Sequence, residues 1–139
     1  MVHIGPVNIL VVEDDVLIRE LAVGVLSEAG FNVTEAGHAD QALRILQAKA
    51  RKFRVVFSDV QMPGRIDGVG LALHVGTCWP WIGLLLTSGK PVPRLEGIFP
   101  AIRFLRKPYV LNEVIGRIHE IAAASLKRPT ERWNAEKSQ

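Results

Sequence analysis

Runs of apolar residues alternate with segments of helical periodicity along most of this 139-residue chain. Continuous or alternating apolar runs predict strands, and apolar residues that recur every three or four positions predict helices. We expect strands over residues 8–12, 31–36, 55–59, 82–86 and 103–106. We expect helices over residues 16–29, 39–50, 69–75 and 111–126, with at most a short, irregular fourth helix over 94–98. This alternation predicts an α/β fold, in which a doubly wound parallel sheet has helices on both faces.

The first predicted helix illustrates the pattern. Its apolar residues recur at helical spacing, which predicts an amphipathic helix with one apolar face, and Gly30 is well placed to end it. These residues are Leu17, Ile18, Leu21, Val25 and Leu26.

Polar side chains follow four of the five predicted strands. Glu13 and Asp14 follow the first strand, Asp59 ends the third, Thr87 follows the fourth and Lys107 follows the fifth. The carboxyl ends of parallel strands meet at one edge of a sheet, which is where such folds bind ligands. We therefore expect these five side chains to form one site.

Three adjacent carboxylates, Glu13, Asp14 and Asp15, repel one another and require an explanation. One interpretation is that Asp15 caps the following helix while the other two are solvated. The alternative is a binding site for a divalent cation. The residues by themselves leave both open.

Composition narrows the class of protein. Hydrophobic residues make up 48% and charged residues 22%, which is typical of a globular protein. No apolar run is long enough to span a bilayer, and the first six residues do not resemble a signal peptide. A lone cysteine, Cys78, excludes an internal disulfide and a cysteine-ligated metal, so we expect a cytoplasmic protein. The net charge of +3 lies largely in residues 127–139, which argues against a nucleic-acid-binding face.

Taken together, the motifs resemble the receiver domain of two-component response regulators. The resemblance extends over residues 8–126 and predicts a receiver domain over residues 1–126, followed by a polar, disordered tail over 127–139. It also implies a flavodoxin-like strand order of 2-1-3-4-5. The motifs are Glu13-Asp14, Asp59-Val60-Gln61-Met62-Pro63-Gly64, Thr87-Ser88-Gly89 and Lys107-Pro108-Tyr109.

This resemblance assigns a phosphoryl acceptor and its metal ligands. Asp59 resembles the acceptor, and Glu13 and Asp14 resemble the acidic pair that holds Mg²⁺, Asp14 directly and Glu13 through water. Gln61 would contribute its backbone carbonyl to the same ion. Magnesium prefers oxygen ligands and is usually held by one or two carboxylates together with phosphate, which suits this set.

The resemblance also assigns the residues that hold the phosphoryl group and respond to it. Thr87 would hydrogen-bond a phosphoryl oxygen, and Lys107 would pair with the phosphoryl group, aimed by a cis peptide bond before Pro108. Phe104, three residues before the lysine, matches the aromatic residue that turns inward when Thr87 moves. Because Phe104 lacks a hydroxyl, its response would depend on packing alone.

The implied function is a phospho-acceptor switch. The phosphoryl donor would be a histidine kinase or a histidine phosphotransfer protein, and a downstream protein partner would read the change. We expect a stand-alone domain, monomeric or weakly dimeric, that binds neither nucleic acid nor membrane and is not an enzyme apart from its own phosphorylation and dephosphorylation. One alternative is a docking module of the same fold that works without phosphorylation. A hydrolase with an aspartyl nucleophile is disfavoured, because Gln61 stands where such enzymes place a second aspartate.

Overall fold

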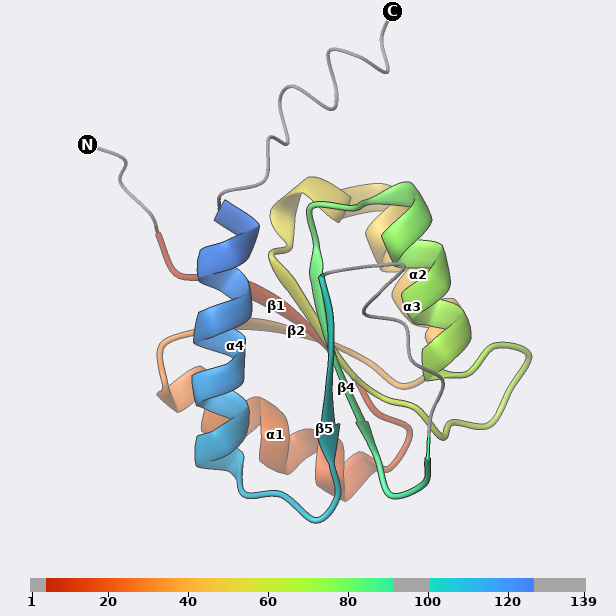
Figure 1. Cartoon of the computed structure of the whole chain (residues 1–139), viewed down its shortest axis with the longest axis horizontal. Helices are drawn as coiled ribbons and strands as arrows, with labels where there is room; N and C mark the ends of the chain where they lie inside the picture. The colour runs from red at the N-terminus through yellow and green to blue at the C-terminus, as the bar shows by residue number, and fades with distance from the viewer. Residues whose placement is uncertain (1–4, 92–100, 127–139) are drawn as a thin grey trace, which may run out of the picture.

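A five-stranded parallel sheet lies between two layers of helices in the computed structural model, which describes residues 5–91 and 101–126 (Figure 1). The strands are β1 (Asn8–Val12), β2 (Asn32–Ala36), β3 (Val55–Asp59), β4 (Gly83–Ser88) and β5 (Ile102–Arg106). Their order in the sheet is β2-β1-β3-β4-β5, and every pairing is parallel. The expected flavodoxin-like order is therefore confirmed.

Four helices and one short 3₁₀ helix connect these strands. They are α1 (Val16–Glu28), α2 (Ala39–Lys49), η1 (Ala50–Lys52), α3 (Gly68–Cys78) and α4 (Leu111–Leu126). Helices α1 and α4 cover one face of the sheet, and α2 and α3 cover the other (Figure 1). The short helix expected over 94–98 and the tail expected over 127–139 lie outside the described residues.

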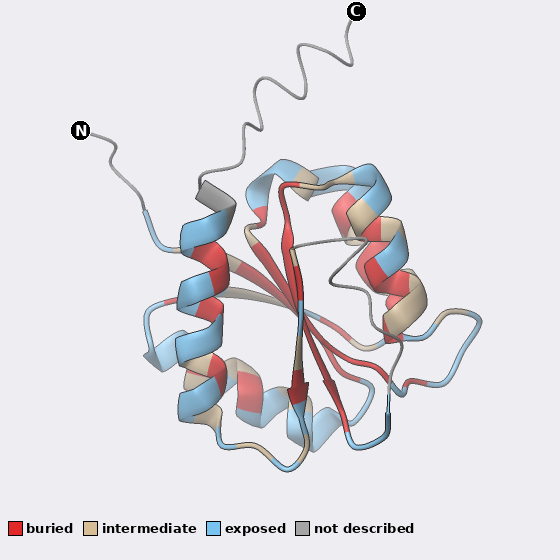
Figure 2. Ribbon diagram, viewed as in Figure 1, coloured by how far each residue is buried: buried red, intermediate tan, exposed pale blue. Residues whose placement is uncertain are grey.

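Alternating side chains of each central strand point to opposite faces of the sheet. In β1, Ile9 and Val11 join the apolar cluster beneath α1 and α4, whereas Leu10 and Val12 join the cluster beneath α2 and α3. Figure 2 shows this buried centre as a continuous set of strands between partly exposed helices. Burial on both faces explains why these strands are continuous apolar runs in the sequence.

Helix α1 forms as predicted, but its buried face is smaller than the apolar spacing indicated. Only Ala22 and Leu26 are buried, whereas Leu17 and Leu21 are 76% and 61% exposed. The exposed residues belong to the first two turns, which begin at the carboxyl edge of the sheet where β1 has already ended. Because the sheet offers these turns no surface to pack on, an apolar patch faces the solvent beside the acidic turn.

The bounds of α3 and β4 differ most from the expected ones. Helix α3 spans Gly68–Cys78 and not 69–75, because Asp67 caps it by accepting a hydrogen bond from the Gly70 amide at 2.9 Å. Strand β4 extends through Ser88, so Thr87 lies within the strand and pairs in register with Asp59 of β3. This pairing places Thr87 directly beside the candidate phosphoryl acceptor.

Candidate functional site

The predicted polar residues meet at the carboxyl ends of β1, β3, β4 and β5. Glu13 and Asp14 begin the loop after β1, Asp59 ends β3, Thr87 lies near the end of β4, and Lys107 follows β5. The structure therefore brings together the five side chains that the strand pattern predicts. Asp59 and Thr87 lie within strands of the sheet, and the other three lie in the first residues of the loops that follow β1 and β5.

The three carboxylates of the acidic turn after β1, residues 13–15, have different roles. Asp15 caps α1, because its Oδ1 accepts hydrogen bonds from the amides of Leu17 and Ile18 at 2.9 and 3.1 Å. Glu13 is buried, and its Oε2 accepts a hydrogen bond from the Asp15 amide at 3.0 Å. The capping interpretation is thus confirmed for Asp15, and Glu13 and Asp14 remain available to a cation.

Arg19, at the end of the first turn of α1, holds this acidic turn in place. Its Nη1 donates to the carbonyl oxygen of Glu13 at 2.8 Å, and its Nε pairs with Glu35 at 2.9 Å. Sequence reasoning did not find this residue. A basic residue six positions after Glu13 points to this role only when the structure is known, because the contact requires α1 to pack beside β2.

Asp59 has one paired and one unpaired carboxylate oxygen. Lys107 Nζ lies 3.0 Å from Oδ2, and the backbone amide of Lys107 donates to the Ser88 carbonyl at 3.0 Å. Oδ1 is buried and has no hydrogen-bond partner among the described residues. The Lys107–Pro108 peptide bond is cis, as the resemblance implied. A buried, unsatisfied carboxylate oxygen is costly unless a ligand or ion completes it.

The carboxylates of Glu13, Asp14 and Asp59 can share one ion. One ligand atom of each lies within 4.8 Å of the others. The donor set consists only of oxygens, which fits Mg²⁺, and the unpartnered Asp59 Oδ1 supplies a position that an ion would satisfy. These residues therefore fit the metal that the sequence predicts.

Burial and charge shift the titration of two of these groups. Burial raises the pKa of the Glu13 carboxyl above its ordinary value, and the negative charges of Asp14 and Asp59 act in the same direction. Burial acts to lower the pKa of Lys107, but its hydrogen bond to Asp59 and the surrounding carboxylates outweigh this effect and raise it. The site thus favours a cation beside Asp59 and carries an excess of negative charge near Glu13.

Gln61 lies at the rim of the site, and its side chain accepts a hydrogen bond there. Its Oε1 accepts a hydrogen bond from Ser88 Oγ at 3.0 Å, and the Ser88 hydroxyl accepts from the Lys90 amide at 3.0 Å. These bonds tie the loop after β3 to the loop after β4. The predicted role of the Gln61 carbonyl toward the metal stays a prediction.

Gly68 lets α3 approach the backbone of the acceptor strand. Its amide donates to the Val60 carbonyl at 2.9 Å, and a Cβ at this position would collide with the Asp59 carbonyl and lie 2.7 Å from the Val60 Cα. No other residue type fits so close to a backbone. No sequence pattern distinguished Gly68, because an Asp-Gly pair ordinarily indicates a turn.

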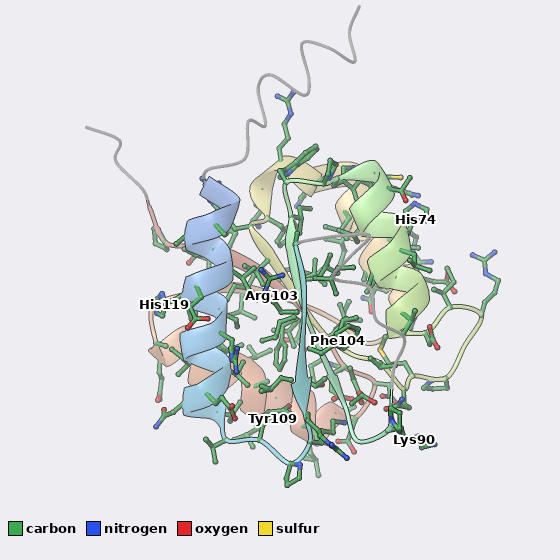
Figure 3. All side chains as sticks on the ribbon, in the orientation of Figure 1. His74, Lys90, Arg103, Phe104, Tyr109 and His119 are labelled. Atoms are coloured by element: carbon green, nitrogen blue, oxygen red, sulfur yellow. The ribbon has the colours of Figure 1, made fainter. Side chains whose placement is uncertain are left out.

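Phe104 lies on the face of the sheet that α2 and α3 cover. It packs against the cluster beneath α2 and α3, on the α3 side of β5 (Figure 3). It also lines a cavity of about 270 Å³ together with Ser88, Lys90 and Pro91. The predicted inward turn of this ring stays a prediction.

The fold and the site define a parallel α/β domain with a carboxylate and lysine centre at the carboxyl edge of its sheet. A family model described as the response regulator receiver domain matches residues 9–119. The chain belongs to this family, so it is a receiver domain of two-component systems.

Relatives support this assignment. The Protein PetR of Rhodobacter capsulatus is 36% identical over 123 residues, which cover 87% of this chain and 51% of PetR. The sensor kinase CckA of Brucella abortus is 30% identical over 120 residues, which cover 84% of this chain and 13% of CckA. The chain thus spans about half or less of these curated relatives.

Solved structures agree with the fold. The receiver domain from the hybrid histidine kinase CckA superimposes with a TM-score of 0.71 at 29% identity, covering 83% of this chain and 98% of that domain. The signal receiver domain of an HD domain-containing protein from Pseudomonas fluorescens gives a TM-score of 0.77 at 24% identity. The match covers 88% of this chain and 99% of that domain. Among the helices that the structure describes, none is long and apolar enough to cross a membrane.

Proposed function

We propose that Asp59 accepts a phosphoryl group from a phosphohistidine, in a Mg²⁺-dependent reaction, and that the resulting change is read by a protein partner. The observation that supports this most directly is the state of the Asp59 carboxylate. It is buried, one oxygen is held by Lys107, and the other has no partner among the described residues while Glu13 and Asp14 lie beside it.

In the transfer itself, a carboxylate oxygen of Asp59 forms the new bond to phosphorus. The bond between phosphorus and the histidine nitrogen breaks, and its electron pair leaves with the imidazole. Like charges oppose the approach, since both the carboxylate and the phosphoryl group are negative. Glu13, Asp14 and Asp59 would hold the Mg²⁺ ion, which supplies charge stabilisation to the phosphoryl oxygens when bound.

Lys107 and Thr87 would act on the other side of the phosphoryl group. Lys107 already lies within hydrogen-bond distance of Asp59 Oδ2, so it offers a positive charge without a large movement. Thr87 pairs in register with Asp59 and is almost fully buried, so the two side chains lie side by side on the same face of the sheet. Donors held in place before the reaction stabilise developing charge more effectively than mobile ones.

The apolar patch at the start of α1 suits the approach of the phosphohistidine donor. Val16, Leu17, Ile18 and Leu21 are all more than two-fifths exposed, and they follow directly after Glu13-Asp14-Asp15. A donor must bring its histidine to Asp59, so a surface bordering the acidic turn is a suitable place for it to dock. The partner would be a histidine kinase or a histidine phosphotransfer protein.

Two further statements belong to this proposal. The chain would act on its own Asp59 and would not turn over an external substrate, so it is not an enzyme in the usual sense. It would work in the cytoplasm, where an exposed free thiol such as Cys78 stays reduced.

Intact-mass spectrometry after incubation with acetyl phosphate tests the proposal. We expect a phosphoryl adduct in the wild type with Mg²⁺ and none in Asp59→Asn. Asp67→Asn is the matched control, because asparagine also caps helices and Asp67 lies outside the acidic cluster. An adduct that persists in Asp59→Asn would refute the acceptor assignment. Absence of an adduct with acetyl phosphate and with a phosphohistidine donor would favour the docking module.

A further inference from the structure

A hollow beside α2 lies apart from the residues that build the Asp59 site. Its volume is about 440 Å³, and residues of α2, of η1 and of the edge strand β2 contribute to its lining. Six of the residues that line this α2 hollow are Arg44, Ile45, Ala48, Lys49, Lys52 and Phe53. None of the predicted site residues is among its lining residues, so the proposed phosphoryl transfer does not explain it.

Helices α2 and η1 concentrate positive charge around the α2 hollow. Residues 39–52 contain four basic residues and one acidic residue, so their net charge of +3 equals that of the whole chain. The acidic residue, Asp40, is paired with Arg65. The four basic residues are exposed, and none of them forms a salt bridge with another described residue. They are Arg44, Lys49, Arg51 and Lys52. The surface therefore presents positive charges that no described carboxylate neutralises by direct contact.

The deeper part of the α2 hollow is apolar. Phe53 is only 2% exposed, and Ile45 is half-buried and packs against the core beneath α2 and α3. Lys52 Nζ lies 5.6 Å from the centroid of the Phe53 ring. A lysine in this position keeps its aliphatic stem on the apolar surface and its charge at the rim. The hollow thus combines an apolar floor with a basic rim.

The α2 hollow and the Asp59 site lie at opposite ends of β3. Lys52 and Phe53 precede this strand, whereas Asp59 ends it. Strand β2 is at the edge of the sheet, so no described strand lies beyond it on the outer side of the hollow. The apolar patch at the start of α1 belongs to the helix layer on the other face of the sheet. A molecule bound in the hollow therefore leaves both Asp59 and that patch accessible.

We propose that the α2 hollow binds an acidic segment of a partner protein. Carboxylates of this segment would pair with Arg44, Lys49 and Lys52, and an apolar side chain between them would contact Ile45 and Phe53. Protein interfaces commonly have this composition, with apolar contacts at the centre and polar contacts at the rim. Complementary charge also speeds the encounter and selects the partner. This inference does not depend on the function proposed for Asp59.

A nucleic acid or a membrane fits this surface less well than a protein segment does. Single-stranded nucleic acids stack their bases on accessible aromatic side chains, but Phe53, the aromatic residue that lines the hollow, is buried. A membrane-binding face exposes large apolar side chains. The exposed large apolar residues of the described chain lie in α1, in α3 and just before α4, and none lies in α2 or η1. An acidic protein segment uses both the buried floor and the exposed charges.

Titration with a short, labelled peptide of alternating glutamate and leucine tests the proposal. By NMR, the amide shifts that change should be those of residues 41–53 and not those around Asp59, and fluorescence anisotropy should give the Kd. The same peptide with glutamine in place of glutamate should bind about tenfold more weakly or less. Raising the salt concentration from about 50 to 500 mM should also weaken binding, because salt screens exposed charges.

Matched variants locate the binding surface. Ala48→Glu places a negative charge in the hollow and should weaken binding about tenfold or more, because like charges repel. Ala124→Glu makes the same change at an exposed position of α4 and should have no effect. Arg44→Gln should weaken binding about two- to fivefold, the effect of one exposed ion pair, and Arg117→Gln on α4 is its control. Asp59→Asn should bind the peptide as the wild type does.

Several results would overturn the proposal. Failure of the glutamate peptide to bind would refute it, and equal binding of the glutamine peptide would show that charge has no role. Shift changes outside residues 41–53, or equal losses in Ala48→Glu and Ala124→Glu, would place binding elsewhere. Tighter binding of a single-stranded oligonucleotide or of phosphatidylserine vesicles to the same residues would replace the protein with another class of partner. Ala48→Glu should still be phosphorylated by acetyl phosphate at the wild-type rate, so this proposal and the function of Asp59 can fail separately.

Discussion

Lys107 Nζ lies 3.0 Å from Asp59 Oδ2, and this ion pair joins residues 48 positions apart in the chain. The two residues belong to the ends of β3 and β5, which are not neighbours, because β4 lies between them. Lys107 therefore reaches across the end of β4 to contact the acceptor. A phosphoryl group on Asp59 would therefore lie beside Lys107.

Replacing Lys107 with alanine should slow phosphorylation without abolishing Mg²⁺ binding. The lysine offers charge to the phosphoryl group, whereas the ion is held by carboxylates. We expect the initial rate with acetyl phosphate to fall by about 10²-fold, the effect of losing one preorganised donor. Mg²⁺ affinity, measured by calorimetry, should stay equal or increase, because a competing cation leaves Asp59. Lys49→Ala, at an exposed end of α2, is the charge-matched control. A loss of Mg²⁺ affinity would mean that the two roles are misassigned.

Mg²⁺ should stabilise the wild type, and Asp14→Asn should remove this effect. At a concentration 100-fold above its Kd, an ion adds about 2.7 kcal/mol to the free energy of unfolding. For a domain of this size, that raises Tm by roughly 10 °C. Without Mg²⁺, Asp14→Asn should be more stable than the wild type, because the substitution relieves repulsion among Glu13, Asp14 and Asp59. Thermal unfolding with and without Mg²⁺ measures both, with Glu28→Gln as control. Equal stabilisation of Asp14→Asn would contradict the proposed metal site.

Sequence patterns were sufficient for the strands and the centre of the site, whereas the strand order came from the resemblance to receiver domains. Parallel strands bring their carboxyl ends to one edge of the sheet, so Asp59, Thr87 and Lys107 could be grouped from their positions alone. The apolar runs of the central strands β1, β3 and β4 reflect their burial on both faces of the sheet. These features depend on local chemistry and on the small number of ways in which parallel strands connect.

Other features depend on where an element ends in space, which periodicity does not report. Leu17 and Leu21 have helical spacing but face solvent, because the first turns of α1 have no sheet beneath them. Tyr109 meets Phe57 edge to face only after the chain has returned along β5. Gly68 is required by a contact with the Asp59 backbone. None of these relationships leaves a periodic trace in the sequence.

The ion pair between Arg65 and Asp40 should set the acid titration of Asp40. Arg65 Nη2 lies 2.9 Å from Asp40 Oδ1, and this hydrogen bond lowers the pKa of the Asp40 carboxyl. A lowered pKa in the folded state gives stability that is present above the unfolded-state pKa and lost as pH falls through the folded-state pKa. Arg65→Gln should therefore raise the pKa, as measured by NMR titration of the Asp40 carboxyl carbon, and destabilise the protein at neutral but not strongly acidic pH. Arg51→Gln is the control, and an unchanged Asp40 pKa in Arg65→Gln would refute the pairing.

Replacing Gly68 and Gly24 with alanine should change the stability of the protein in opposite directions. Gly68→Ala would press a methyl group against the Asp59 and Val60 backbone and should destabilise the protein by about 2 kcal/mol or more. Gly24 lies exposed within α1 with no atom near its missing Cβ, so Gly24→Ala should stabilise by about 0.5–1 kcal/mol. Urea unfolding of both variants measures these changes. Similar effects at the two positions would mean that the close approach at Gly68 is relieved by movement of α3.

The apolar patch on α1 should matter for a protein donor and not for a small one. Leu17→Ser and Leu21→Ser remove exposed side chains that no core contact needs, so the fold and the rate with acetyl phosphate should be unchanged. Transfer from a phosphohistidine protein should slow about tenfold or more, because truncating a central apolar contact of an interface costs over 1 kcal/mol. Leu73→Ser, on the exposed side of α3, is the matched control. Intact mass measures the rate of phosphorylation with both donors. If the rate with acetyl phosphate falls as much as the rate with the phosphohistidine protein, the substitutions have damaged the site. If neither rate falls, the donor docks elsewhere.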